Sequence, residues 1–437
     1  MESSLKHALN KALDFINGRI ANNGKFAAID QAVISVANFL ASILLAALVS
    51  PTELGVYVLG FLAIYFVRAV QNGIIVQPLN TYGAAKTEEE FKPYFSAIAL
   101  QQMILSIMTA LTAAIIGWIL IQTGNDTLGP TIFVLWFSFF TWQLQELMRR
   151  AFYTRGEVHK AMWVSTCANL IRLGLILILA SLRSISGITG LNAIGWGSLG
   201  GTILGLWLGR DYFTSKLQQP FSIWRENWQF GRWILGASVA DWVVVDLYPI
   251  FMAGMISFAA TGVYQALQNL VAPIHVLLRA VDTFATPILA KLFDQSGLDK
   301  INQALKRIYL LAAVPVVGLL ILVLLFTPQL LTLLRGETYL AYGDAIYIMV
   351  VFYLFLFINR PLQMAFRAIR QGKQIFWANV LAAISMFTIG FLLINRWGIY
   401  GGIGGQALNA FIISVVLLIA WIRQNRAKAP NASGIIS

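Results

Sequence analysis

Twelve long apolar runs follow one another along the chain, and they restrict its fold more than any other feature. Each run is close to the about 20 residues that a helix needs to cross about 30 Å of hydrocarbon. Because lipid offers backbone N–H and C=O groups no hydrogen-bond partners, such runs are expected to be helical. They cover roughly residues 26–49, 56–79, 94–121, 129–150, 161–182, 190–208, 231–256, 262–289, 308–327, 340–366, 375–395 and 400–422. The sequence therefore predicts an all-α polytopic membrane protein with about twelve transmembrane helices.

The composition agrees with this fold class and excludes a soluble domain. Hydrophobic residues make up 58% of the chain and charged residues only 11%, which is far from the balance of a globular domain in water. The single cysteine, Cys167, lies inside an apolar run, so an intrachain disulfide is excluded and a small core residue is indicated.

Residues 1–25 are predicted to form an amphipathic helix on the membrane surface. Leu5, Leu9 and Leu13 recur at helical spacing, and Lys6 and Lys11 lie between them. Because the segment has no continuous apolar core, it resembles neither a signal peptide nor a membrane span.

Loop charge predicts the orientation of the chain. With an even number of spans both termini lie on one side, and placing them in the cytoplasm gives the inner segments 24 Lys and Arg. The outer loops then hold only Arg183, Arg335 and Arg396. Under the positive-inside rule this ratio predicts cytoplasmic N and C termini. The same rule explains the net charge of +12 by topology and contacts with anionic lipid, without any nucleic acid.

The chain contains an internal repeat. Ser50–Tyr57 (SPTELGVY) returns 207 positions later as Ser257–Tyr264 (SFAATGVY), and Ile194-Gly195 returns 209 positions later as Ile403-Gly404. These offsets indicate two six-helix halves. The predicted organisation is a cytoplasmic surface helix at 1–25, an N-lobe at 26–208, a cytoplasmic linker at 209–230, a C-lobe at 231–422 and a cytoplasmic tail at 423–437.

Each half holds an even number of spans, so both halves have the same orientation in the membrane. They are expected to be related by an axis along the membrane normal, as in the parallel repeats of alternating-access transporters, with a substrate site in the cleft between lobes. A repeat kept for packing alone is the alternative.

The residues around the repeat also resemble a known family. The first span ends in Ala46–Tyr57 (AALVSPTELGVY), and the basic loop Arg149–Lys160 follows the fourth span. In this pattern the chain resembles the polysaccharide-exporter branch of the multidrug/oligosaccharidyl-lipid/polysaccharide superfamily, which includes Wzx-type O-antigen flippases. The resemblance covers nearly the whole chain and is clearest over residues 26–170. Lipid II flippases of the superfamily usually carry two further helices, so that subclass fits less well.

This resemblance implies a MATE-like fold of two six-helix bundles in the cytoplasmic (inner) membrane of a bacterium. It implies flipping of an undecaprenyl-pyrophosphate-linked oligosaccharide, an O-antigen or exopolysaccharide repeat unit, to the outer leaflet. A polymerase and other glycan-assembly proteins are the partners expected beside such a flippase. No cofactor is expected, although coupling to H⁺ or Na⁺ is.

Four arginines within the spans are the candidates for binding the pyrophosphate: Arg68, Arg172, Arg279 and Arg360. An arginine at mid-bilayer depth costs at least about 2.5–3.5 kcal/mol, so it is expected to face protein or water. Arg68 and Arg172 lie near the middles of their spans without an acidic residue at helical spacing. Arg279 and Arg360 lie nearer the cytoplasmic ends, where snorkelling explains them equally well.

Four further titratable residues are candidates for ion coupling or for counter-charges: Asp30, Asp241, Asp246 and His275. Asp30 either couples an ion or pairs with Lys25 or Arg232 at the inner surface. Asp241 and Asp246 lie about 140° apart on a helix, so they do not form one carboxylate pair. His275 either titrates near neutral pH or is a neutral core histidine.

Asp282 is expected to pair with Arg279, three residues before it on one helix. Buried amides such as Gln71, Gln102 and Gln143 are expected to join helices, with sugar binding as the alternative. Boundary aromatics such as Trp118, Trp142 and Trp397 are expected to be interfacial anchors first and sugar platforms second.

Two rival functions fit the composition less well. A membrane-embedded glycan polymerase or glycosyltransferase needs a catalytic constellation outside the bilayer, and the outer loops hold no acidic pair, Cys-His arrangement or metal-ligand spacing. We therefore assign no catalytic residue and no metal site. A MATE-like small-molecule or drug antiporter is the closer alternative, but the four arginines favour an anionic substrate.

The orientation is testable with reporter fusions. Alkaline phosphatase fused at residue 230 or at the C terminus is expected to be inactive, because the positive-inside rule places both in the cytoplasm. Fusions in the loop near Arg183 serve as the control and should be active. Strong activity at residue 230 would contradict the arrangement of two parallel halves.

Overall fold

A computed structural model describes the backbone of residues 2–215, 219–333 and 337–428. Side chains are described from residue 23 onward, except at 333, 337, 338 and scattered positions between 237 and 296, which include Asp241 and Arg279. No strand occurs in this part of the chain, which confirms the all-α class.

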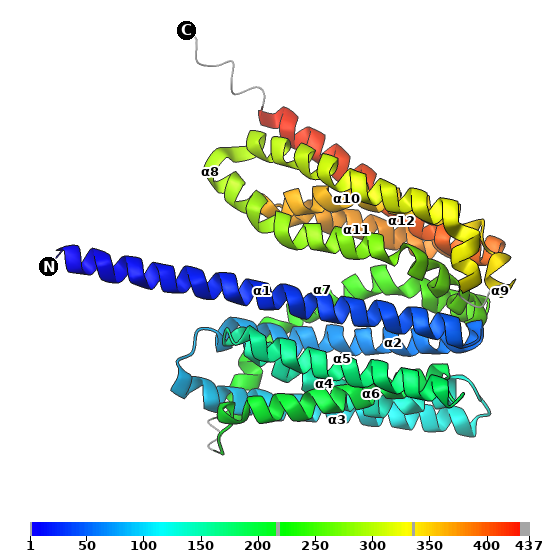
Figure 1. The fold of residues 1–437 in the computed structure, drawn as a ribbon, viewed down its shortest axis with the longest axis horizontal. Coiled ribbons are helices and arrows are strands. Elements are labelled where there is room, and N and C mark those ends of the chain that lie inside the picture. Colours follow the sequence, from blue (N-terminus) through cyan, green and yellow to red (C-terminus); the bar gives the residue numbers. More distant parts are fainter. Residues whose placement is uncertain (1, 216–218, 334–336, 429–437) are drawn as a thin grey trace, which may run out of the picture. The chain divides into compact units, whose positions relative to one another are not determined.

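The helices follow the predicted apolar runs closely (Figure 1). They are α1 (Glu2–Leu48), α2 (Pro51–Gln71), α3 (Glu88–Gln122), α4 (Leu128–Thr154), α5 (Val158–Ser181), α6 (Gly187–Leu208), α7 (Pro220–Met255), α8 (Phe258–Leu333), α9 (Glu337–Leu340), α10 (Ala345–Ala368), α11 (Gly372–Ser385) and α12 (Phe391–Lys428). The predicted surface helix and first span are one continuous helix, α1. Helix α7 begins at Pro220, inside the segment predicted as a linker.

Three helices extend or break where the sequence gives a physical reason. After α2, two π-helical turns, Asn72–Val76 and Leu79–Gly83, surround Pro78, whose missing N–H interrupts the hydrogen-bond ladder. Helix α8 is two helices joined at Gly297 (φ 68°), and α12 is broken at Gly398 (φ 57°). Only glycine adopts such positive φ values without strain. These breaks separate the eighth predicted span from the ninth and the eleventh from the twelfth.

Seven of the described helices are long and apolar enough to cross a membrane by length and composition. They cover Asn23–Leu48, Pro51–Gly83, Glu88–Gln122, Val158–Ser181, Gly297–Thr332, Ala345–Ala368 and Gly372–Arg426. Helix α4 is less apolar because its buried residues include amides and charges, Gln143, Glu146 and Arg149 among them. The chain is therefore a multi-pass membrane protein.

The chain folds into two compact units. Unit 1 contains Met1–Leu45 and Leu59–Trp242, and unit 2 contains Ala46–Val58 and Val243–Ser437. The units follow packing, so the first turns of α2 belong with the second half of the chain.

In unit 1, α4 packs against α3, α5 and α6. A cluster of buried side chains at one end of these helices includes Phe91, Phe95 and Phe152. Three buried amides join α2, α3 and α4: Gln71 donates to Gln102 Oε1 (2.9 Å), and Gln102 donates to Gln143 Oε1 (3.2 Å). Gln71, Gln102 and Gln143 are all fully buried. The three amides therefore hold helices together, as the sequence predicted.

In unit 2, α10 packs against α8 and α12, and α11 packs against α12. A cluster of its buried side chains includes Leu289, Phe366 and Trp421, with the Phe366 and Trp421 rings in an edge-to-face contact at 5.3 Å. The packed layers of helices bury apolar side chains inside and leave others, such as Leu311 and Val314 (both 76% exposed), for lipid.

The repeated octapeptide forms the first turns of α2 and α8, and the two copies are capped alike. Ser50 Oγ accepts a hydrogen bond from the Glu53 N–H (3.3 Å), and Ser257 Oγ accepts one from the Ala260 N–H (3.1 Å). In each copy a serine oxygen satisfies one of the backbone donors that a helix start leaves open.

Within unit 2 these two helix starts also cross each other in contact. A Cβ atom on Gly55 would overlap the carbonyl oxygen of Phe258, and one on Gly262 would overlap that of Pro51. Since Phe258 and Gly262 lie 207 residues after Pro51 and Gly55, the contact is reciprocal. This is the relation that a two-fold axis between the two copies produces, and it requires glycine at both positions.

Replacing Gly55 with alanine is expected to lower the melting temperature in detergent, because an added Cβ forces the two backbones apart at a cost of about 1–3 kcal/mol. Gly262→Ala should have a similar effect. The matched control is Gly404→Ala on α12, where a Cβ meets no atom within 4 Å and alanine favours the helix by about 1 kcal/mol. Equal melting temperatures for Gly55→Ala and Gly404→Ala would contradict the close crossing.

Candidate anion-binding and ion-binding site

Unit 1 buries a cluster of four charged side chains. Arg149 bonds Asp30 Oδ2 through Nη2 (2.9 Å) and Nε (3.1 Å) and Glu146 Oε2 through Nη1 (2.9 Å). Arg150 Nε pairs with Glu146 Oε1 at 2.6 Å, and Tyr153 OH donates to Asp30 Oδ2 at 2.6 Å. The Arg149 side chain is 8% exposed and that of Asp30 is 0% exposed. Two carboxylates and two guanidinium groups thus neutralise each other, and of the four only Arg150 is partly exposed.

The local sequence of α4 explains the cluster. One face of α4 carries the charges: Arg149 and Arg150 lie three and four residues after Glu146, and Tyr153 lies four and three residues after these arginines. Asp30 reaches this face from α1. Its Oδ2 atom accepts three hydrogen bonds, whereas its buried Oδ1 atom has no partner among the described residues.

One of the two alternatives for Asp30 was a salt bridge with Lys25 or Arg232. That alternative is wrong, because the Asp30 carboxylate pairs with Arg149. Arg149 had been counted only as a topology signal in a basic inner loop. The signal that could have found it is the Glu146-x-x-Arg149-Arg150 spacing at the end of an apolar run, because charges buried there need partners at three and four residues.

Arg172 and Arg68 lie at the two ends of an aromatic pair on α2. The Arg172 guanidinium lies 5.6 Å from the centre of the Phe61 ring and donates to Asn38 Oδ1 (2.7 Å). The Phe61 and Tyr65 rings lie 4.7 Å apart, and the Arg68 guanidinium lies 5.7 Å from the Tyr65 ring. Cation–π contacts of this kind suit a guanidinium in a place with few carboxylates.

Burial separates these two arginines. Arg172 is 6% exposed, whereas Arg68 is exposed and has neither a hydrogen bond nor a salt bridge to any described residue. Arg68 also interacts electrostatically with Glu146. We call Asn38, Arg172, Arg68 and the Asp30 cluster together the polar track, and Arg68 is its exposed guanidinium.

The track carries an excess of positive charge. Its members are four arginines, Arg68, Arg149, Arg150 and Arg172, and two carboxylates, Asp30 and Glu146. Because Arg149 and Arg150 are matched by the carboxylates, Arg68 and Arg172 supply the excess. Arg172 lies about 21 Å along α5 from Val158, at mid-span depth.

The other candidates lie on α7, α8 and α10. Arg360 and Asp246 are half-buried, and the His275 ring meets the Tyr353 ring edge-to-face at 6.4 Å. The side chains of Arg279 and Asp241 lie outside the described residues. Asp282 pairs with Arg367, whose Nη1 lies 3.0 Å from Asp282 Oδ1, and the expected pair of Asp282 with Arg279 stays a prediction because the Arg279 side chain lies outside the described residues.

Outside the spans, a polar contact closes the loop between α4 and α5. Glu157 pairs with Lys160 (2.6 Å) and accepts a hydrogen bond from Tyr212 OH (2.7 Å). Burial acts to raise the pKa of Glu157, but hydrogen bonds from Lys160 and Tyr212 outweigh it and hold that pKa below its usual value. The contact ties the loop between α4 and α5 to Tyr212. Among the described residues, no three His, Cys, Asp or Glu side chains gather as a metal site would require.

Comparison with known families identifies the chain. A family model described as polysaccharide biosynthesis protein matches residues 44–344. The chain belongs to this family. No curated protein matches the sequence.

Solved structures show that this polysaccharide biosynthesis protein has the MATE-like fold. An inward-facing multidrug resistance MATE family transporter of the MOP superfamily aligns with a TM-score of 0.75 at 13% identity, over 93% of this chain and 99% of that one. The lipid II flippase MurJ, in an inward closed conformation, aligns with a TM-score of 0.69 at 12% identity, over 90% and 86%. A MOP superfamily transporter from Pyrococcus furiosus, whose binding pocket is described as reversed in polarity, aligns with a TM-score of 0.62 at 13% identity, over 94% and 95%.

The buried ion pair is testable through stability. Arg149→Met is expected to lower the free energy of unfolding by about 3–5 kcal/mol, because it leaves Asp30 buried and unpaired. Adding Asp30→Leu should restore much of the loss, since the remaining charge is then removed. The measurement is the melting temperature in detergent.

Arg367→Met is the matched control, because the Arg367 side chain is 41% exposed and its pair with Asp282 is partly open to solvent. Such pairs contribute about 0–1 kcal/mol. An Arg149→Met protein as stable as Arg367→Met would contradict a stabilising role for the buried cluster.

Proposed function

We propose that this protein flips a polyprenyl-pyrophosphate-linked oligosaccharide, an O-antigen or exopolysaccharide repeat unit, across the cytoplasmic membrane of a bacterium by alternating access. The observation that carries the proposal is Arg68, an exposed guanidinium within an apolar span that no described carboxylate pairs. The polysaccharide biosynthesis family and the MATE-like fold support the same function.

The charge balance of the track favours an anionic substrate. Keeping an arginine within a span is costly, and a bound anion offsets that cost. Phosphate oxygens match the planar guanidinium, which donates two parallel hydrogen bonds at once. A lipid-linked pyrophosphate is an anion that a membrane protein meets inside the bilayer. A cationic drug would instead be repelled by the excess of arginines.

The residues of the track then have distinct roles. Arg68 binds the pyrophosphate, and Arg172, held by Asn38 and Phe61, adds a second positive charge deeper in the span. Asp30 and Glu146 neutralise Arg149 and Arg150, so that these two do not compete for the substrate. Binding neutralises the excess charge, which lowers the cost of reorienting the loaded protein. No bond is made or broken, and the delivered glycan becomes available to a polymerase or other glycan-assembly proteins.

Ion coupling is the second part of the proposal. Asp30 is the candidate, because its buried Oδ1 atom has room in its bonding pattern for a proton or a sodium ion. In vesicles, flipping is expected to fall to background when both the proton and the sodium gradients are removed. Undiminished flipping would contradict coupling and would point to movement drawn by later polymerisation.

The proposal predicts a separation between export and stability at Arg68. Arg68→Ala is expected to reduce export at least about tenfold with an unchanged melting temperature, since the side chain is exposed and forms no hydrogen bond or salt bridge with a described residue. Arg68→Lys should restore export only in part, because lysine keeps the charge but loses the bidentate fork. The measurement is the lipid-linked saccharide accumulated in the inner leaflet.

Arg225→Ala is the control, because Arg225 is an exposed arginine of α7 outside the track. It should leave both export and stability unchanged. Normal export by Arg68→Ala would overturn the role of Arg68. A loss of stability that matches the loss of export would instead assign Arg68 to the structural ion pairs.

A further inference from the structure

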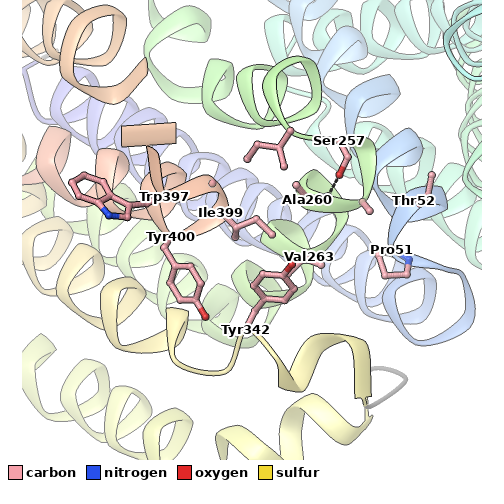
Figure 2. Close-up of a pocket in the computed structure, with 12 residues that line it drawn as sticks. Pro51, Thr52, Ser257, Ala260, Val263, Tyr342, Trp397, Ile399 and Tyr400 are labelled. Carbon is pink, nitrogen blue, oxygen red and sulfur yellow. Dashed lines mark hydrogen bonds between the residues drawn. The ribbon is translucent and has the colours of Figure 1, made fainter. Parts of the chain in front are cut away.

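Unit 2 contains a cavity of about 560 Å³ that the pyrophosphate site does not use. Its walls come from the first turns of α2 and α8, the turn between α9 and α10, and the break in α12 (Figure 2). All four segments lie in loops or helix ends that the positive-inside rule places on the outer side. The volume is within the range of about 300–1,000 Å³ that is usual for small-molecule sites.

Three aromatic residues line this cavity. The Tyr342 and Tyr400 rings lie 6.2 Å apart at an angle of 39°, and Tyr400 OH donates to the carbonyl of Ala341 (3.4 Å), which ties α12 to the turn before α10. Trp397 lies at one end of the cavity, opposite Thr52, and is 56% exposed (Figure 2). Its indole is steadied by the Arg396 guanidinium, 5.6 Å from the ring.

The backbone break at Gly398 brings Trp397 and Tyr400 to the wall of the cavity. The positive φ of 57° turns the chain between Trp397 and Tyr400, so both side chains face the outer end of unit 2. An unbroken helix would also place Trp397 and Tyr400, three residues apart, on one face. Such a helix would, however, continue into the bilayer. The turn instead keeps the aromatic rings at the boundary.

The polar side chains of the cavity are the hydroxyls of Thr52, Ser257, Tyr342 and Tyr400 and the Trp397 indole, and the lining that the structure describes contains no Asp, Glu, Lys, Arg or His. Thr52 and Ser257 are both exposed. Ser257 Oγ accepts the N–H of Ala260, which leaves its own proton for a ligand oxygen. A neutral ligand with an apolar face and several hydroxyls fits this combination, because rings of Trp and Tyr offer flat apolar area with a polar edge.

We propose that this cavity is an outer-side saccharide subsite that holds a neutral sugar ring of the oligosaccharide, with Trp397, Tyr342 and Tyr400 against the ring and Thr52 and Ser257 bonded to its hydroxyls. The proposal rests on the proposed function, because the sugar ring belongs to the oligosaccharide that the flippase carries. This subsite lies in unit 2, whereas Arg68 lies in unit 1. It assigns the pyrophosphate and the sugar to separate places with opposite chemistry: guanidinium groups for one, and aromatic rings with hydroxyls for the other.

The test uses the full chain in detergent and a phosphate-free probe. Mild acid releases the free oligosaccharide from the polyprenyl-linked glycan of the same cells, and saturation-transfer NMR measures its contact with the protein. Transfer to sugar C–H groups is expected with the wild type and at least about a tenfold weaker affinity with Trp397→Ala. Trp377→Ala is the matched control, because Trp377 is 52% exposed on α11 outside the cavity, and it should bind normally.

A second variant guards against misfolding. Thr52→Trp fills the end of the cavity opposite Trp397 without removing any ring, and it should also abolish transfer while the melting temperature is unchanged. Arg68→Ala should bind the probe normally, because the probe carries no phosphate. Wild-type protein without transfer, or equal transfer with Trp397→Ala, would overturn the subsite.

The same proteins separate this proposal from the proposed function. Export that is normal in the wild type and unaffected by Trp397→Ala or Thr52→Trp would overturn the subsite and leave the flippase proposal standing. Probe binding at Trp397 in a protein that exports no lipid-linked saccharide would overturn the proposed function and support the subsite.

Discussion

The salt bridge between Arg149 and Asp30 is the interaction on which the polar track of unit 1 depends. A charge removed from water is costly unless a partner of opposite charge meets it with good geometry. Arg149 meets Asp30 across two helices and Glu146 within its own helix. This pairing matches two carboxylates with two guanidinium groups, and it leaves Arg68 as an exposed guanidinium without a salt bridge to a described residue.

The same constraint shapes the rest of the span. Aromatic faces also contact guanidinium groups: Phe61 and Tyr65 on α2 lie against Arg172 and Arg68. Where amides are buried, they bond each other, as Gln71, Gln102 and Gln143 do between α2, α3 and α4. The paired polar side chains of unit 1 thus join helices. Arg68, which has no salt bridge to a described residue, is the one that we propose for binding.

Unit 2 depends on close backbone packing where α2 and α8 begin. The starts of α2 and α8 touch at Gly55 and Gly262, and their serine caps satisfy the first backbone donors. This close crossing forms one wall of the aromatic cavity, whose other wall comes from the break at Gly398. The packing of Gly55 and Gly262 against backbone therefore shapes the cavity that we propose as a saccharide subsite, although neither glycine lines it.

The sequence alone determined the all-α membrane class, the helix positions and the repeat, because the apolar runs and the octapeptide are local patterns that lipid and backbone hydrogen bonding translate directly into helices. It also singled out Arg68 and Arg172, since a charge in an apolar run is visible without coordinates. Only the tertiary structure decided the partners. Asp30 pairs with Arg149 and Asp282 with Arg367, neither of which sequence spacing predicted, because helices that lie far apart in the chain meet through packing. The cavity beside Trp397 was likewise invisible, since it arises where four separate segments converge.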